Sequence, residues 1–366
     1  MNPSAALLLL IATVVSGQIA SPSFDELSAK AQQAYDAKHD EEAARLYAEA
    51  VRLQPDWAQG WWALGTIAYE LDQYPACRDA LTRMLALDAS AAAGWALLGL
   101  CEFNVKEYDP ALEHLKKAHM LVPVKAPGGQ LLDMANYHLA LLLTRQGAFE
   151  VAQEELMHVA LRAPNNAEMI FAAGLPSLRM SILPSDVPAD QHDVVAMAGR
   201  AFWDLATKSP EQADSDFKAL VEAHPKFPNV HFFYGTFLGA RDPDKCAAEF
   251  LEELRINPQS VPARVQLALR YIVEGKPREA LKYAKGAVTL SPDSVGSQLA
   301  LGEALRASGD DAHALSAYQA AEKLDPVSPK IRLYLANAYR ALGRADEMRH
   351  EQDEYRRLKA EQQNWP

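Results

Sequence analysis

Histidines and paired carboxylates are the residues of this sequence that could bind a metal or transfer protons. His114 and His119 lie five residues apart, whereas a helical metal site uses two histidines four residues apart on one face. Adjacent acids such as Glu154 and Glu155 point about 100° apart on a helix. A solvated charged face explains such acids better than paired acid–base catalysis does. The residue types therefore predict no metal site.

Short motifs for catalysis or nucleotide binding are also missing from the sequence. It contains no G-x-x-x-x-G-K-[ST], G-x-G-x-x-G, G-x-S-x-G or H-E-x-x-H, the motifs for phosphate, dinucleotide, nucleophilic serine and zinc chemistry. We therefore expect a protein that is not an enzyme and holds no cofactor. Its net charge of −12 repels phosphate backbones, so nucleic acid is not expected as a partner.

The composition indicates which elements must position the remaining residues. Ala and Leu far outnumber the β-branched residues, and this bias favours helices over strands. The chain is 49% hydrophobic and 23% charged over 366 residues, as is usual for a folded protein with a large core. An all-α protein is expected.

The N-terminus carries an apolar run over residues 5–15. This run is shorter than the roughly 17 to 25 residues that span a bilayer, so no integral membrane span is expected. Val15 and Gly17 match the small residues that precede signal-peptidase cleavage. We therefore expect a signal peptide over residues 1–17 and a secreted or periplasmic location. Because the first four residues lack Lys and Arg, a buried first helix is the alternative.

Three cysteines, Cys77, Cys101 and Cys246, occur in Ala-rich stretches. An odd number excludes a fully paired disulfide framework. Free cysteines in such stretches usually act as small buried hydrophobic residues, which is the expectation for all three. A bridge between Cys77 and Cys101 is the alternative.

Similar phrases ending in proline recur along the chain. INP, LSP and LDP end at Pro258, Pro292 and Pro326, which are 34 residues apart. The spacing W-x2-L-G starts at Trp61 and again at Trp95, one period later. Self-similarity at this period is typical of helical repeats. Small residues at fixed places in each period would let two helices approach closely, and the prolines would end the second helix.

This pattern resembles the tetratricopeptide repeat, in particular that of bacterial secreted or periplasmic proteins. The resemblance implies an αα-superhelix of about nine helix pairs. About four repeats occupy residues 18–166 and about five, with a charged capping helix, occupy residues 194–360. Residues 361–366 form a tail.

Residues 167–193 do not fit the repeat, because Pro176, Pro184 and Pro188 interrupt helix pairing. We expect an irregular joint there. Either a helix splits at Pro176 into two halves that imitate a pair, or two smaller arrays meet at this segment. The joint is either a decayed repeat or a hinge or partner site.

In the family resembled, ligands occupy a concave groove lined by fixed positions of each first helix. Carried over to this sequence, these positions give the candidate partner-binding residues Gln32, Tyr35, Gln59, Trp62, Thr66, Tyr69, Phe103, Asn104, Tyr137 and Arg145. Later repeats supply a more aliphatic wall, with Phe232, Thr236, Val265, Leu269, Ile272, Leu299 and Arg306. Trp62 and Tyr69 are the favoured anchors, because Trp61 already occupies the packing position beside them.

The resemblance implies a non-enzymatic scaffold or adaptor that holds a protein or peptide segment in this groove. A carbohydrate-binding or exopolysaccharide-export accessory is the alternative, since aromatic walls also stack on glycans.

The apolar run and the small residues after it predict export with removal of about 17 residues. N-terminal sequencing or the intact mass of protein made in its host measures this directly. Recovery of the full-length chain from the cytoplasm would contradict the prediction.

Overall fold

The computed structural model describes residues 22–122, 129–163, 165–207, 210–239 and 241–364. Within these ranges the chain forms 19 α-helices and no strand, which confirms the expected all-α class. The predicted signal peptide lies outside the described residues. The chain divides into two compact units, Met1–Ala89 and Ser90–Pro366.

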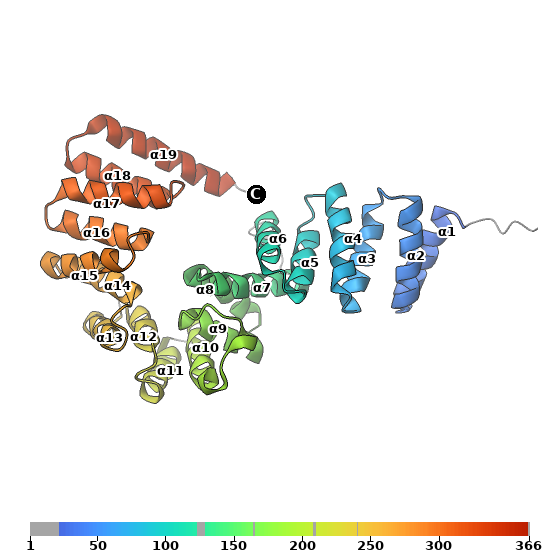
Figure 1. Ribbon diagram of the computed structural model, residues 1–366, viewed down its shortest axis with the longest axis horizontal. Coiled ribbons are helices and arrows are strands. Elements are labelled where there is room, and N and C mark those ends of the chain that lie inside the picture. Colours follow the sequence, from blue (N-terminus) through green and yellow to red (C-terminus); the bar gives the residue numbers. More distant parts are fainter. Residues whose placement is uncertain (1–21, 123–128, 164, 208–209, 240, 365–366) are drawn as a thin grey trace, which may run out of the picture. The chain divides into compact units, whose positions relative to one another are not determined.

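The first unit contains two antiparallel helix pairs (Figure 1). Its helices are α1 (Phe24–Asp36), α2 (Asp40–Leu53), α3 (Ala58–Glu70) and α4 (Tyr74–Leu87). Helix α1 begins with a capping box, in which the Ser23 hydroxyl accepts from the Glu26 backbone N–H and the Glu26 carboxylate accepts from the Ser23 backbone N–H.

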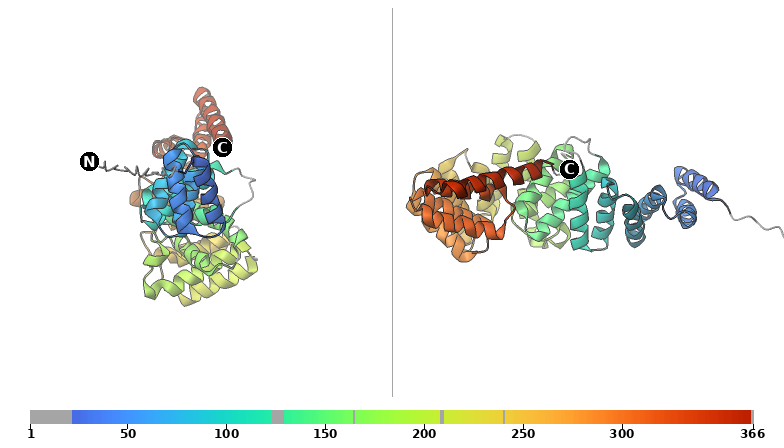
Figure 2. Two further views of the ribbon diagram at one scale, coloured as in Figure 1. Left: turned by 90° about the vertical axis from the view of Figure 1, so that its right-hand side faces the viewer. Right: turned by 90° about the horizontal axis from the view of Figure 1, so that it is seen from above.

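The second unit continues as a stack of helices that pack against their neighbours in sequence. They are α5 (Ala92–Asn104), α6 (Tyr108–Leu121), α7 (Gln130–Gln146), α8 (Phe149–Arg162), α9 (Ala167–Ser177), α10 (His192–Thr207), α11 (Pro210–Ala223), α12 (Val230–Leu238), α13 (Pro243–Ile256), α14 (Val261–Val273), α15 (Pro277–Leu290), α16 (Val295–Ala307), α17 (Asp311–Leu324), α18 (Pro329–Ala341) and α19 (Ala345–Asn364). Figure 2 shows the orange and red helices of this unit in successive antiparallel layers.

Small residues allow the two helices of a pair to touch, as the sequence pattern predicts. A Cβ added at Gly65 would lie 2.7 Å from the Leu81 side chain, and one at Gly302 would lie 2.3 Å from the Tyr318 ring. At each glycine, a large side chain of the partner helix therefore packs directly against the backbone.

The predicted prolines also lie where a second helix ends. Helices α13, α15 and α17 end at Ile256, Leu290 and Leu324, each two residues before Pro258, Pro292 or Pro326. The last carbonyls of each helix are thus followed by a residue that cannot continue the helical ladder.

A side chain six residues after such a proline bonds back to the proline carbonyl. The donors differ in chemistry, but each supplies an N–H to a carbonyl of the loop between repeats. The donor–acceptor pairs are Trp61 and Pro55 at 2.8 Å, His231 and Pro225 at 3.0 Å, Arg264 and Pro258 at 2.6 Å, Gln298 and Pro292 at 2.8 Å, and Arg332 and Pro326 at 2.9 Å. We call this contact the loop bond. In these five cases it ties the start of a new first helix to the end of the preceding pair.

Residues 167–193 consist of a packed helix followed by an irregular connection over 178–191, which contains the short 3-10 helices Pro184–Asp186 and Ala189–Gln191. Helix α9 runs over most of the segment's first half without splitting at Pro176, which lies next to its last residue, and α9 packs against α10. Added Cβ atoms at Gly174 and Gly199 would each lie 2.0 Å from a carbonyl oxygen of the facing helix. Leu183 and Val187 in the connection are buried as well. The two units meet after Ala89, so this segment lies inside one of them.

The cysteines differ from the expectation of three free thiols. Cys246 is free and buried, as expected. Cys77 and Cys101 are disulfide-bonded, so the expectation is wrong for these two.

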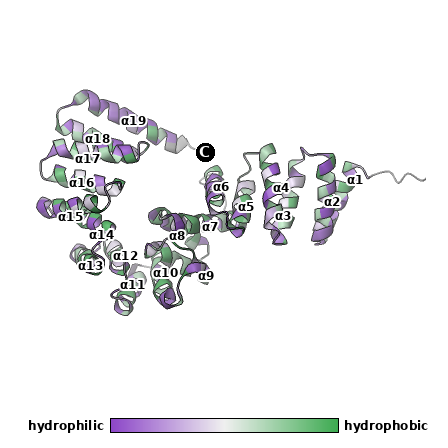
Figure 3. Cartoon of the chain, in the orientation of Figure 1, coloured by the Kyte–Doolittle hydropathy of each residue, from purple (hydrophilic) through white to green (hydrophobic). Residues whose placement is uncertain are grey.

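Helix α19 is the charged capping helix that the sequence predicts. Figure 3 shows it almost wholly hydrophilic. Its one strongly buried apolar side chain in the described part is Leu358, and ion pairs such as Arg357–Glu354 lie along its exposed side. Such a polar outer side suits the end of a repeat array.

None of the described helices combines the length and apolar character that crossing a membrane requires.

The α9–α10 contact predicts opposite effects for two glycine-to-alanine changes. Gly199→Ala places a methyl group against the Ile170 carbonyl and should destabilise the protein by about 2 to 3 kcal/mol. Gly286→Ala, the matched control inside α15, meets only the Arg264 side chain at 3.4 Å and should stabilise by about 0.5 to 1 kcal/mol. Urea unfolding measures both changes. Equal effects of the two variants would show that the helices do not approach as described.

Candidate functional site

Six of the sequence-predicted partner residues lie on α1 and α3 of the first unit. Gln59 is exposed, while Tyr35, Trp62, Thr66 and Tyr69 are half-buried. Gln32 is exposed but engaged in the fold. Its side-chain carbonyl accepts from the Tyr47 hydroxyl at 2.9 Å and its amide donates to Asp36 at 2.8 Å.

Three neighbouring tryptophans have different surroundings. Trp57 packs edge-on against Phe24, with ring centroids 5.0 Å apart. The Trp61 indole forms the loop bond to Pro55. Trp62 is half-buried, and its indole has neither a hydrogen-bond partner nor a ring contact in the described part of the chain. Trp62 is therefore the tryptophan of this group whose indole makes no hydrogen bond and no ring contact among the described residues.

Tyr69, the second favoured anchor, lies against another ring. Its centroid is 5.8 Å from that of Tyr74, in an edge-on arrangement, and burial raises the pKa of its hydroxyl. Tyr69 is thus partly engaged, and Trp62 is the stronger candidate.

The remaining four predicted residues lie in the second unit. Phe103 packs edge-on against His138 and Tyr108, at 4.6 and 5.5 Å between centroids, and the Arg145 guanidinium lies 4.7 Å from the centre of the Tyr108 ring. The Asn104 amide donates to the Leu100 carbonyl of its own helix.

Tyr137 does not belong to an exposed groove. Only 4% of its surface is exposed, because it packs into the core beside α9. Its hydroxyl donates to Glu168 at 3.4 Å. The repeat pattern places this position in the groove, but helix α9 covers it, so the Tyr137 side chain is buried.

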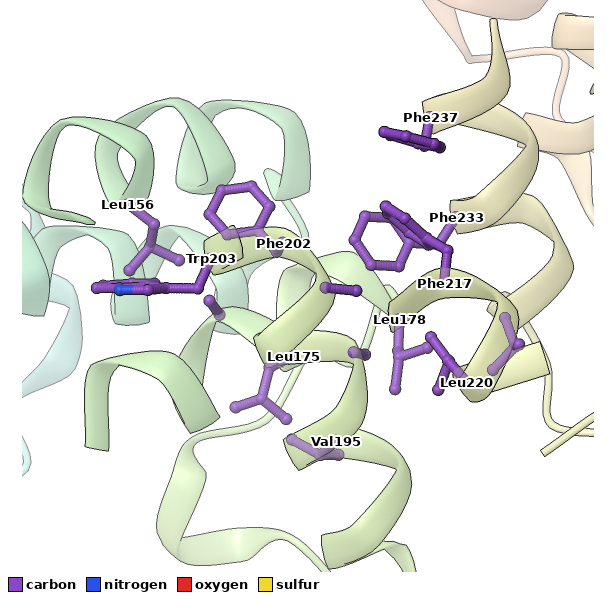
Figure 4. Close-up of a cluster of buried hydrophobic side chains, with 14 of the residues drawn as sticks. Leu156, Leu175, Leu178, Val195, Phe202, Trp203, Phe217, Leu220, Phe233 and Phe237 are labelled. Carbon is purple, nitrogen blue, oxygen red and sulfur yellow. The ribbon is translucent and has the colours of Figure 1, made fainter. Parts of the chain in front are cut away.

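A cavity of about 510 Å³ in the second unit has an aromatic floor. Five phenylalanines from α10, α11 and α12 form this floor: Phe202, Phe217, Phe232, Phe233 and Phe237. The ring of Phe217 lies 4.6 Å from those of both Phe233 and Phe237. Figure 4 shows these rings side by side, with Phe202 facing them from α10. We call this site the phenylalanine cavity.

Two arginines lie at the rim of the phenylalanine cavity. Arg179 forms an ion pair with Glu150 at 2.6 Å. Arg241 lies 4.7 Å from the centre of the Phe237 ring, and its Nη1 donates to the Phe237 carbonyl at 2.9 Å. Arg241 has no ion-pair partner among the described residues. Glu154 and His158 line the cavity from α8 and are exposed.

A buried carboxylate fixes the start of α12, which supplies three of the five rings. Glu253 is 0% exposed and accepts from the backbone N–H groups of Asn229, at 2.9 and 3.0 Å, and of Phe232, at 3.4 Å. Burial raises the pKa of this carboxyl, although the N–H groups oppose the rise. Asn229 has a left-handed backbone, with φ at 70°, and its amide donates to the Leu178 carbonyl. The bonds to Glu253 tie the start of α12 to α13, and the Asn229 amide ties it to the residue that follows α9.

His231 reinforces the same region. Its Nδ1 faces Glu249 at 2.6 Å and its Nε2 faces the Pro225 carbonyl at 3.0 Å. Both partners are acceptors, so they favour the positively charged imidazole, in which both ring nitrogens can donate. Burial opposes this charge, but the bonds to Glu249 and Pro225 outweigh it and raise the pKa of His231.

Among the described residues, no cluster of His, Cys, Asp and Glu side chains is arranged to hold a metal ion.

A family model described as tetratricopeptide repeat matches residues 265–329 and, overlapping them, 299–358. Residues 265–358 of the chain are tetratricopeptide repeats. The matched residues correspond to α14–α19, where the loop bonds and the small-residue contacts recur with the 34-residue period.

Several solved structures resemble the chain. MamA 41-end from Desulfovibrio magneticus RS-1 is 18% identical, with 46% of this chain and 95% of that chain covered and a TM-score of 0.40. The APC/C hetero-tetramer Cut9-Hcn1 is 16% identical, with 92% and 73% covered and a TM-score of 0.33. The P58(IPK) TPR domain is 15% identical, with 88% and 99% covered and a TM-score of 0.30. No curated protein matches. At these TM-scores no functional argument rests on the likenesses.

The tetratricopeptide pattern gives only part of the phenylalanine cavity. It places Phe232 and Thr236 on the inner wall, but it assigns no ligand position to Phe202 or Phe217. The aromatic run FFYGTF over residues 232–237 is the signal that marks this site in the sequence.

The charged state of His231 predicts a pH-dependent stability. Since its folded pKa is raised above 6.5, its contribution is complete below that pH and is lost as the pH rises through the folded pKa. His231→Gln should therefore destabilise the protein most at about pH 5.5 to 6 and least under alkaline conditions. Urea unfolding from pH 5.5 to 9 measures this, with the exposed His313→Gln as control. A His231→Gln effect that does not change with pH would contradict a charged His231.

Proposed function

We propose that this protein is a non-enzymatic scaffold that binds a segment of a partner protein on the first helices of its N-terminal repeats. The observation that carries this proposal is the unengaged indole of Trp62 on α3. Tyr35, Gln59, Thr66 and Tyr69 accompany it on α1 and α3, and we call this set the Trp62 surface.

The energetics of protein interfaces support Trp62 as the anchor. A few large aromatic side chains carry most of the binding free energy at an interface, and tryptophan is prominent among them. A half-buried indole whose N–H has no partner among the described residues offers both apolar area and one directional donor. Gln59 and Thr66 add polar groups beside it, as at the rim of many interfaces.

Export to an oxidising compartment is part of the proposal. The apolar N-terminal run followed by small residues is typical of a signal peptide. Disulfide bonds persist mainly in secreted and periplasmic proteins, and Cys77 and Cys101 are disulfide-bonded. A secreted or periplasmic scaffold is consistent with both features.

Truncating Trp62 should weaken partner capture without unfolding the protein. We expect Trp62→Ala to reduce affinity for the partner by about thirtyfold, equivalent to about 2 kcal/mol, with a nearly unchanged melting temperature. Trp61→Ala is the matched control, because it removes the loop bond to Pro55 and should lower the melting temperature.

The mature chain is first used to capture partners from envelope extract, and each captured protein is then titrated against both variants. Soluble glycans are added as competitors in a parallel capture. Unaltered binding by Trp62→Ala, or a large loss of its stability, would contradict the proposal. Capture that glycans abolish would contradict a protein partner.

A further inference from the structure

The phenylalanine cavity has the size and chemistry of a small-molecule site, and it is independent of the Trp62 surface. Its volume of about 510 Å³ lies within the range of roughly 300 to 1,000 Å³ that is usual for such sites. Five rings, with Met157 and Leu205, make its wall mainly apolar. An apolar ligand body would exclude water from this floor.

The rim of the cavity adds an exposed cation, the Arg241 guanidinium. Arg241 stacks on Phe237 and donates one N–H to the Phe237 carbonyl. Most of its five N–H donors therefore stay available. A guanidinium held by such contacts loses little freedom when it binds a carboxylate, and it can bind one through two parallel hydrogen bonds.

The other charges at the rim are neutralised or solvated. Arg179 lies 5.6 Å from the centre of the Phe232 ring and is paired with Glu150 at 2.6 Å, so Glu150 competes with a ligand carboxylate for it. Glu154 and His158 are exposed on α8 and can turn toward water. Arg241 is consequently the cation of this rim that lacks a carboxylate partner among the described residues.

We propose that the phenylalanine cavity binds a small amphiphilic carboxylate, with its aryl or alkyl body on the five rings and its carboxylate on Arg241. Both halves of the ligand are needed, because the floor offers no charge and Arg241 alone offers no specificity for an apolar body.

Three probes with the same body and different head groups test this proposal: 4-phenylbutyrate, 4-phenylbutanol and 4-phenylbutylamine. Titration calorimetry on the full chain should show that the acid binds at least tenfold more tightly than the amine, with the alcohol between them. Arg241→Gln should weaken binding of the acid about tenfold or more and leave the alcohol unchanged.

Glu154→Gln is the matched control, since it neutralises a rim charge on the opposite wall and should not weaken binding of the acid. Thr236→Trp fills the cavity from an exposed position and should abolish binding of all three probes while the melting temperature is retained. No binding of the acid, equal binding of the three head groups, or a loss caused by Glu154→Gln in place of Arg241→Gln would overturn the proposal.

Discussion

The loop bond is the interaction on which the arrangement of the repeats depends. Each described example joins a side-chain N–H to the proline carbonyl six residues earlier, and so connects a new first helix to the helix pair before it. The carbonyl is otherwise left without a helical partner at the end of the second helix. Tryptophan, histidine, arginine and glutamine all satisfy it, so the position requires a donor more than it requires an aromatic ring. The loop bond is therefore also formed in repeats that carry His, Arg or Gln at the position of Trp61.

The same constraint separates residues that hold the fold from residues left for binding. Trp61 and His231 occupy the donor position and form the loop bond. Their neighbours Trp62 and Phe232 come one residue later and point about 100° further around the helix. Trp62 is half-exposed, and Phe232 joins the floor of the phenylalanine cavity. Each candidate surface therefore includes the residue that directly follows a loop-bond donor.

The repeat architecture could be predicted from the sequence because its determinants are local. Helix-ending prolines, turn glycines and small contact residues each act within one 34-residue period. Gly147, Gly275, Gly309 and Gly343 have positive φ angles, as turn glycines should. Lys38, Asp72 and Lys106 adopt the same left-handed backbone at the corresponding turns, where lysine, unlike glycine or aspartate, is uncommon.

Contacts between elements could not be predicted in the same way. The pairing of α9 with α10 depends on Gly174 and Gly199, which lie on helices separated by a 14-residue connection over 178–191. Because α9 covers α7, Tyr137 is buried although its repeat position indicates a groove. The phenylalanine cavity combines rings from three helices, and only the FFYGTF run is visible as a local signal.

Site-specific photo-crosslinking in the host tests most directly whether the residue beside the loop bond is the one that meets a partner. A benzophenone amino acid replaces Trp62 in one variant and Trp61 in another, and both are irradiated in intact cells. The account predicts a discrete adduct with another protein from position 62 and little or none from position 61. Adducts from position 61 alone, or none from position 62 while the protein is folded and exported, would contradict it.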